Sequence, residues 1–130
     1  MLSKSESQKI SQTLISVYET IIQLLNWNKN ISSAEDYYSS EQGMQLLAAN
    51  CTLITAIGEG INRINRVSPE FLKDNFPEVP WRDIIGMRNH IAHGYFELDA
   101  ELVYESIATE FPELLSTIST AIEIINKFEN

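Results

Sequence analysis

The sequence is poor in several residue types, and each shortage excludes a class of protein. It has one cysteine in 130 residues, so it cannot form an internal disulfide framework, and a reducing cytoplasm is the expected location. Its continuous apolar runs are shorter than the ~18–20 residues that cross a bilayer. The amino-terminal residues MLSKSESQK lack the apolar segment of a secretory signal. We therefore expect a cytoplasmic protein that makes no membrane contact.

Basic residues are also scarce, with nine Lys and Arg against eighteen Asp and Glu, for a net charge of −9. Binding to a polyanion depends largely on basic side chains, so we expect no DNA partner and no general affinity for nucleic acid. The charge is uneven along the chain. Residues 97–129 hold eight acidic residues and one lysine, whereas residues 59–88 hold five acidic and five basic residues. The motif region is therefore locally neutral, and any contact with RNA should be short and local.

Apolar residues recur at steps of three and four, and no segment alternates with period two or contains a hairpin dipeptide. The pattern predicts a first helix from near Ser5, where Ser5 and Gln8 have the spacing of a capping box. A polar connection follows at 26–40, and a second helix runs from near Ser39 to about Val67. At 44% hydrophobic, 130 residues suffice for one domain with a core, spanning 1–130. We predict an all-α fold, an antiparallel bundle of four main helices plus a short helix.

The second half of the chain supplies the other helices. A proline and an acid after Ser68 predict a short helix that ends before Asn75. The next helix should run from a first turn at Pro80 to Gly94, the residue that would end it. Two further helices are predicted at 100–108, capped by Asp99, and from Pro112 onward.

The predicted second helix contains two glycines, Gly58 and Gly60. Each costs about 1 kcal/mol in helix propensity relative to alanine. Their expected use is close approach of another helix or a ligand. Glu59 lies between the two glycines and Arg63 lies three residues after the second, so Glu59 and Arg63 are spaced i,i+4. Two interpretations remain open for Glu59, an ordinary surface ion pair with Arg63 or a polar organiser beside the catalytic helix.

Both histidines of the chain lie on the predicted 80–94 helix, beside Arg88 and just before Tyr95. RNA can be cut without a metal because its own 2′-hydroxyl is the nucleophile. Histidine suits the two proton transfers, and the arginine guanidinium suits the phosphate. The alternatives are a surface arginine with a helix-end histidine, and a metal site on His90 and His93, for which no third ligand stands out.

The spacing R-x-x-x-x-H-x-Y of Arg88, His93 and Tyr95 resembles the HEPN superfamily, and more closely its HepT branch. That branch comprises ribonuclease toxins paired with small nucleotidyltransferase antitoxins. Four segments share the likeness in the family's order and together span over half of the chain: IGEG at 57–60, FPEVPWRDIIGMRN at 76–89, HGYF at 93–96 and FPELL at 111–115.

The resemblance implies a metal-independent endoribonuclease toxin of a type VII-like toxin–antitoxin system, with no cofactor. It implies a homodimer that joins two motifs in one cleft, with Arg88 and His93 catalytic and Asn89 as a supporting residue. An MNT-like nucleotidyltransferase antitoxin would neutralise the enzyme by transferring AMP to Tyr95. His90 is outside the motif and should be dispensable.

Two other functions remain open. One is a non-catalytic HEPN module that binds substrate or nucleotide for a nucleotidyltransferase. The other is a helical interaction protein that presents its acidic carboxy-terminal face to a basic partner. Tyr95 could also be a packing residue. Trp81 and Phe96 are predicted to be core residues and Cys51 an inert one, because all three follow the apolar pattern.

Overall fold

A computed structural model gives the structure of the chain and describes residues 1–91 and 97–129. Every regular element in these ranges is a helix, so the predicted all-α class is confirmed. The elements are α1 (Lys4–Trp27), the 3₁₀ helix η1 (Ala34–Tyr38), α2 (Glu41–Val67), α3 (Phe71–Asn75), α4 (Trp81–Ile85), α5 (Met87–Ile91), α6 (Ala100–Glu105), the π-helical turn η3 (Ser106–Glu110) and α7 (Phe111–Glu129).

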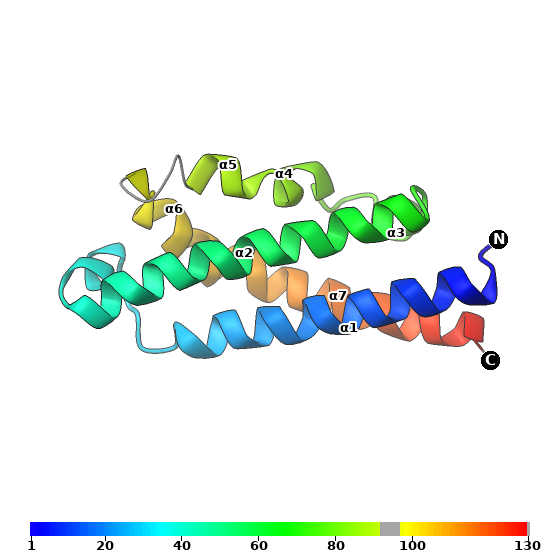
Figure 1. Cartoon of the computed structure of the whole chain (residues 1–130), viewed down its shortest axis with the longest axis horizontal. Coiled ribbons are helices and arrows are strands. Elements are labelled where there is room, and N and C mark those ends of the chain that lie inside the picture. The colour runs from blue at the N-terminus through cyan, green and yellow to red at the C-terminus, as the bar shows by residue number, and fades with distance from the viewer. Residues whose placement is uncertain (92–96, 130) are drawn as a thin grey trace.

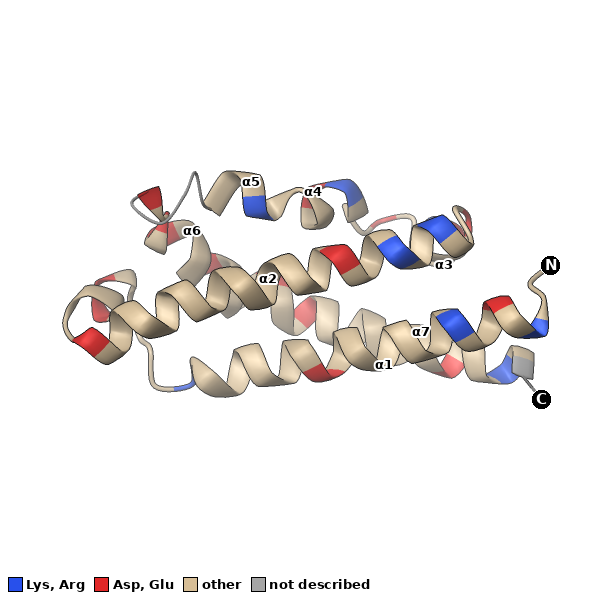
Figure 2. Ribbon diagram, viewed as in Figure 1, with Lys and Arg blue, Asp and Glu red and all other residues tan. Residues whose placement is uncertain are grey.

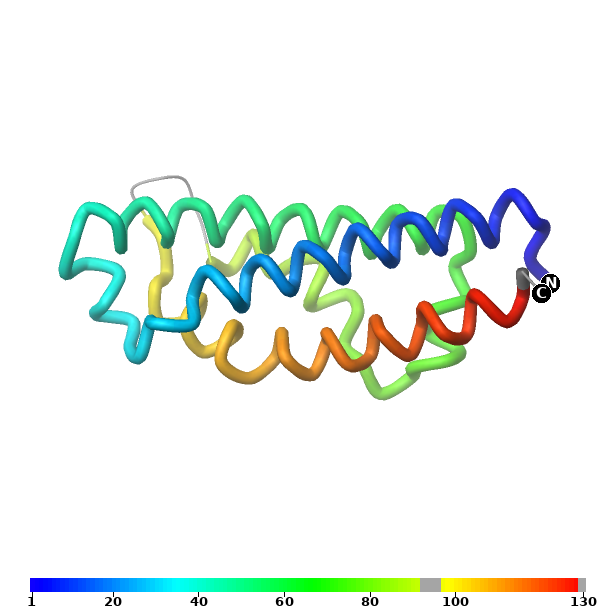
Figure 3. Tube along the Cα trace, turned by 90° about the horizontal axis from the view of Figure 1, so that it is seen from below, coloured from blue at the N-terminus to red at the C-terminus, as the bar shows by residue number. Residues whose placement is uncertain are grey.

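Three long helices, α1, α2 and α7, lie side by side along the long axis of the molecule (Figures 1 and 3). α1 packs against both α2 and α7, and α2 also packs against α3, α4, α5 and α6. The pair α4–α5 completes the fourth side of the bundle over α2. The start of α1 and the end of α7 lie at the same end of the bundle.

Serine residues cap the first two long helices. The cap of α1 lies two residues before the predicted one, and the cap of α2 lies one residue after it. Ser3 caps α1: its Oγ accepts from the Glu6 backbone N–H at 3.0 Å, and the Glu6 carboxylate accepts from the Ser3 N–H at 2.8 Å. This second bond lowers the pKa of Glu6. The predicted cap at Ser5 with Gln8 is wrong because a charged carboxylate accepts a stronger hydrogen bond than an amide. α2 is capped by Ser40.

The carboxy-terminal helices are continuous, and the predicted break before Pro112 is wrong. Asp99 does cap α6, its Oδ1 accepting from the Leu102 N–H at 3.0 Å. Helical backbone then runs through the π-helical turn into α7. Proline lacks an N–H and its ring crowds the carbonyl four residues back. The wider turn immediately before Pro112, in which the Phe111 N–H donates to the Ser106 carbonyl, accommodates that ring.

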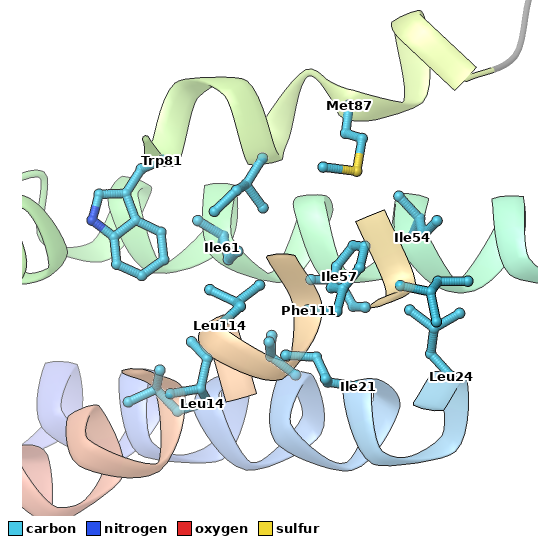
Figure 4. Close-up of a cluster of buried hydrophobic side chains, with 14 of the residues drawn as sticks. Leu14, Ile21, Leu24, Ile54, Ile57, Ile61, Trp81, Met87, Phe111 and Leu114 are labelled. Atoms are coloured by element: carbon cyan, nitrogen blue, oxygen red, sulfur yellow. The ribbon is translucent and has the colours of Figure 1, made fainter. Parts of the chain in front are cut away.

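The core is built from apolar side chains that all the long helices direct inward (Figure 4). α2 contributes most centrally, because its apolar residues face α1 on one side and α4–α5 on the other. Trp81 is 7% exposed and belongs to this core, as predicted. Burial raises the pKa of the Cys51 thiol. The central members include Leu14, Ile21, Leu24, Ile54, Ile57, Ile61, Met87, Phe111 and Leu114.

A buried polar cluster interrupts this core near the connection between α1 and α2. Tyr37 Oη donates to Asn28 Oδ1 at 2.7 Å, and Asn50 Nδ2 donates to Asn28 Oδ1 at 2.9 Å and lies 3.1 Å from Tyr37 Oη. Asn28 Nδ2 donates to Asn50 Oδ1 at 2.7 Å. The three side chains are 5% exposed or less. They satisfy one another and so fix the 26–40 connection onto α2.

α2 is the one helix within residues 1–91 and 97–129 that is long and apolar enough, on average, to cross a membrane. The high mean hydropathy of α2 does not come from one continuous run of apolar residues. α2 packs against α1 and against the short helices α3, α4, α5 and α6, and 33% of its most apolar 18-residue stretch is buried.

Candidate functional site

The site forms where α2 passes beneath α4 and α5, and Gly58 sets the distance between them. A Cβ at Gly58 would lie 3.1 Å from the Ile85 carbonyl oxygen and 3.4 Å from that of Ile84. Only glycine allows this approach without displacing α4. Gly60 faces the other way, where a Cβ would lie 2.5 Å from Cγ2 of Val17 on α1. The predicted close helix approach is therefore confirmed at both positions.

The predicted 80–94 helix is broken at Gly86, which ends α4 with φ −87° and ψ 0°. The Asn89 N–H then donates to the Gly86 carbonyl at 3.0 Å, a three-residue step that starts α5. Pro80 is the cap of α4, so its predicted place inside the first turn is also wrong. Glycine has low helix propensity, and α4 must press its carbonyls onto Gly58, which favours ending the helix there. α5 is therefore a separate short helix, and it carries Arg88.

A hollow of about 180 Å³ opens between these helices and brings together three of the predicted site residues. Arg88 and Asn89 enter it from α5 and Glu59 from α2, all with exposed side chains. Thr55, Gly58, Asn62 and Ile85 complete its lining. We call it the Arg88 hollow. His90 is exposed and does not line it.

The two remaining predicted site residues, His93 and Tyr95, lie in residues 92–96, outside the described residues. Gly94 and Phe96, the predicted helix end and core residue, fall in the same range. The site described here is therefore the arginine side of the motif. α5 ends at Ile91, two residues before His93 in the chain.

Glu59 belongs to the hollow, and no ion pair joins it to Arg63 in the described part of the chain. The ion pair found among the described residues joins Lys73 to Glu70 at 3.3 Å, and both side chains are exposed. Glu59 also lines a separate hollow of about 400 Å³ between α1 and α2. Of its two interpretations, the structure supports the position beside the motif helix.

The α2–α4–α5 side of the molecule is close to neutral, in contrast to the net charge of the whole chain, because residues 59–88 hold five basic and five acidic residues. Figure 2 shows Lys and Arg on the second half of α2 and on α4 and α5. Among them are Arg63, Arg66, Arg82 and Arg88. Arg88 is the one of these four that lines the Arg88 hollow, and its guanidinium can hold a phosphate with two parallel hydrogen bonds.

Residues 1–91 and 97–129 contain no group of three or more His, Cys, Asp or Glu side chains that could hold a metal ion. This finding does not extend to His93. The described lining offers a guanidinium, two amides, a hydroxyl and a carboxylate. Such a set can bind a phosphate ester and orient polar groups around it.

Comparison with known proteins places the chain among ribonucleases. The sequence model of the family described as "Ribonuclease HepT-like" matches residues 21–121. This chain belongs to the ribonuclease HepT-like family. The matched range contains α2, α4, α5 and every predicted site residue. The resemblance drawn from the motifs is thereby confirmed.

Individual relatives are similar over part or most of their length. "Putative RNase MJ1216" of Methanocaldococcus jannaschii is 26% identical over 122 residues, 93% of this chain and 94% of that protein. "Putative RNase TTE0752" of Caldanaerobacter subterraneus is 32% identical over 71 residues, 55% of this chain and 57% of that protein. "Probable ribonuclease HepT" of Thermococcus cleftensis is 33% identical over 58 residues, 45% of this chain and 49% of that protein. No solved structure matches this chain.

The sequence reasoning missed Thr55 and Asn62 as lining residues and Gly86 as the break that orients α5. A usable signal for the first two was present. Thr55, Glu59 and Asn62 are spaced by four and three residues, so they form one polar stripe on α2 that passes the motif helix.

Proposed function

We propose that this chain is a metal-independent endoribonuclease in which Arg88 and His93 are catalytic and Asn89 and Glu59 support them. The observation that carries the proposal is the Arg88 hollow, which gathers Arg88, Asn89 and Glu59 next to the helix that leads into His93. Membership of the ribonuclease HepT-like family and the names of its relatives agree with RNA cleavage.

In the proposed reaction, the 2′-oxygen of RNA forms a bond to the adjacent phosphorus as the bond from phosphorus to the 5′-oxygen breaks. One His93 takes the proton of the 2′-hydroxyl, and a second gives a proton to the departing 5′-oxygen. Arg88 stabilises the charge that develops on the phosphate oxygens. Each chain has one such histidine, so two chains in a homodimer would supply the acid and the base. The products are a 2′,3′-cyclic phosphate and a 5′-hydroxyl.

The regulation that fits this enzyme is covalent. An MNT-like nucleotidyltransferase partner would transfer AMP to Tyr95: the phenolic oxygen attacks the α-phosphate of ATP, and pyrophosphate leaves. The added phosphate and adenosine would oppose RNA entry by charge and by volume. Intact mass after incubation with that partner and ATP should increase by AMP units in wild type and not in Tyr95→Phe. Equal labelling of both proteins would refute this site.

Cleavage of single-stranded RNA by the purified chain in the presence of a chelator tests the ribonuclease directly. Arg88→Ala and His93→Ala should each lower the cleavage rate by about a thousandfold or more, since each removes a group needed in the transition state. His90→Ala is the matched control and should retain activity.

The products should carry cyclic phosphate ends. Activity that disappears with chelator, or that survives both active-site substitutions, would contradict the proposal. A folded wild-type chain that cleaves no RNA would point to a non-catalytic substrate- or nucleotide-binding module instead.

A further inference from the structure

A second, larger hollow adjoins the Arg88 hollow on the same side of α2. It has a volume of about 410 Å³ and lies between the second half of α2, the α2–α3 connection, α3 and α4. The two hollows share Asn62 and Ile85, so they lie next to each other along α2, and we call them together the α2–α4 groove. From Gly58 to Asn65 the groove follows α2 for about 10 Å at the α-helical rise.

The outer part of the groove is lined by groups that complement a nucleotide. Asn62 and Asn65 offer amide donors and acceptors, and Arg82 and Lys73 offer positive charge. Lys73 forms an ion pair with Glu70 at 3.3 Å, whereas Arg82 forms no ion pair within the described ranges. Glu59, at the opposite end, is the one acid among the described lining residues. The groove is therefore more basic than the chain as a whole.

One wall of the outer hollow is rigid and apolar. The Trp81 ring is fixed because its Nε1–H donates to the Phe76 carbonyl at 3.2 Å and because it packs against the Phe76 ring in a T-shaped arrangement, with 6.4 Å between centroids. Trp81 is 7% exposed. It therefore bounds the hollow without needing to reorganise when a ligand enters, which lowers the entropy lost on binding.

The two volumes differ in what they can hold. Pockets for small organic ligands are typically about 300–1,000 Å³. The Arg88 hollow is too small for that range, and a phosphate group with part of a ribose fits it better. The outer hollow falls within the range and has room for a nucleobase.

We propose that the α2–α4 groove binds single-stranded RNA beyond the cut bond: the outer hollow takes the neighbouring nucleotide, Arg82 contacts its phosphate, and Asn62 and Asn65 read its base edge. The assignment rests on the proposed ribonuclease function. An asparagine amide matches the N6 and N7 groups of adenine with two hydrogen bonds, so adenine is the expected base at this position. Arg82 and Asn65 act here as positioning and specificity residues.

Fluorescence anisotropy with a 2′-O-methyl RNA hexamer measures binding separately from cleavage, because the blocked 2′-oxygen cannot attack. Wild type should bind an adenine-containing hexamer more tightly than a dinucleotide or a uridine hexamer. Arg82→Ala and Asn65→Ala should each weaken hexamer binding about tenfold. Arg66→Ala is the matched control, because Arg66 is an exposed arginine of α2 outside both hollows. It should stay within about twofold of wild type, as expected for a residue outside the contact surface.

Cleavage of the unmodified hexamer gives the second readout, in which Arg82→Ala and Asn65→Ala should raise KM with a smaller effect on kcat. If wild type cleaves RNA and these variants match Arg66→Ala in both assays, the groove assignment is wrong and the ribonuclease stands. If wild type binds the hexamer through Arg82 and cleaves nothing, the groove stands and the ribonuclease fails. If wild type neither binds nor cleaves, both fail.

Discussion

Asn28, Tyr37 and Asn50 show how much a few buried polar atoms determine in this molecule. Their side chains come from the end of α1, from η1 and from the middle of α2, and each hydrogen-bonds to the others in a buried region. A polar group buried without a partner is costly, so the cluster is stable only as a complete set. It therefore holds the α1–α2 connection in one arrangement.

Tyr37→Phe should destabilise the fold by about 1–3 kcal/mol, because it removes one partner from buried Asn28 and Asn50. Tyr38→Phe is the matched control: the neighbouring tyrosine is 57% exposed, and exposed substitutions usually stay within about 0.5 kcal/mol of wild type. Urea unfolding of the two variants and wild type gives the comparison. Similar midpoints for both variants would show that the cluster adds nothing to stability.

The same residue predicts a dependence on alkaline pH. Burial raises the pKa of Tyr37 to about 12, against about 10 in an unfolded chain. The folded protein thus holds this proton more tightly, and the resulting stability is complete below pH ~10 and is lost as pH rises towards ~12. Unfolding free energies measured across this interval should fall less for Tyr37→Phe than for wild type or Tyr38→Phe. Parallel curves for all three proteins would contradict the assignment.

At the scale of helices, the contact of α2 with α4 decides where the motif residues point. α4 places backbone carbonyls against Gly58, and Gly86 then ends α4 before α5 begins. Arg88 and Asn89 reach the hollow from this second short helix. The position of the site therefore depends on two glycines that lie in different elements.

Gly58→Ala should be less stable than Gly86→Ala by about 1–3 kcal/mol, the usual range for overpacking a close contact. The new Cβ at residue 58 lies 3.1 Å from a backbone oxygen of α4, whereas at residue 86 the nearest atom is 3.4 Å away and φ is an ordinary −87°. Alanine at mid-helix position 58 also gains helix propensity, which it does not at the cap position 86, so the measured difference is a lower bound on the cost of the contact. Thermal unfolding measures it, and a Gly58→Ala variant more stable than Gly86→Ala would show that α4 moves freely.

The sequence predicted the long helices because their apolar period is a local property that each segment carries by itself. Local patterns could not show that Gly86 breaks the motif helix, since that depends on Gly58, which lies 28 positions earlier. The Asn28–Tyr37–Asn50 cluster was missed for the same reason: its members join segments separated by the chain's first turn. Glu59, Arg88 and Asn89 could be named together only through the family resemblance, and the fold then explains why they meet.

For the whole molecule, the main prediction is a homodimer. One chain supplies one Arg88 and one His93, which is too few for an acid and a base. Light scattering at micromolar concentration should give twice the 14.8 kDa mass of the chain. A monomer under these conditions would exclude a composite cleft.

The paired position of the chain's two ends has a mechanical consequence. α1 starts and α7 finishes at one pole of the bundle, and the two helices lie against each other (Figure 3). Tension applied through the ends would peel these helices apart turn by turn, loading only a few contacts at a time. The fold should consequently yield to pulling at lower force than a bundle whose ends lie at opposite poles, where a whole helix interface must slide at once.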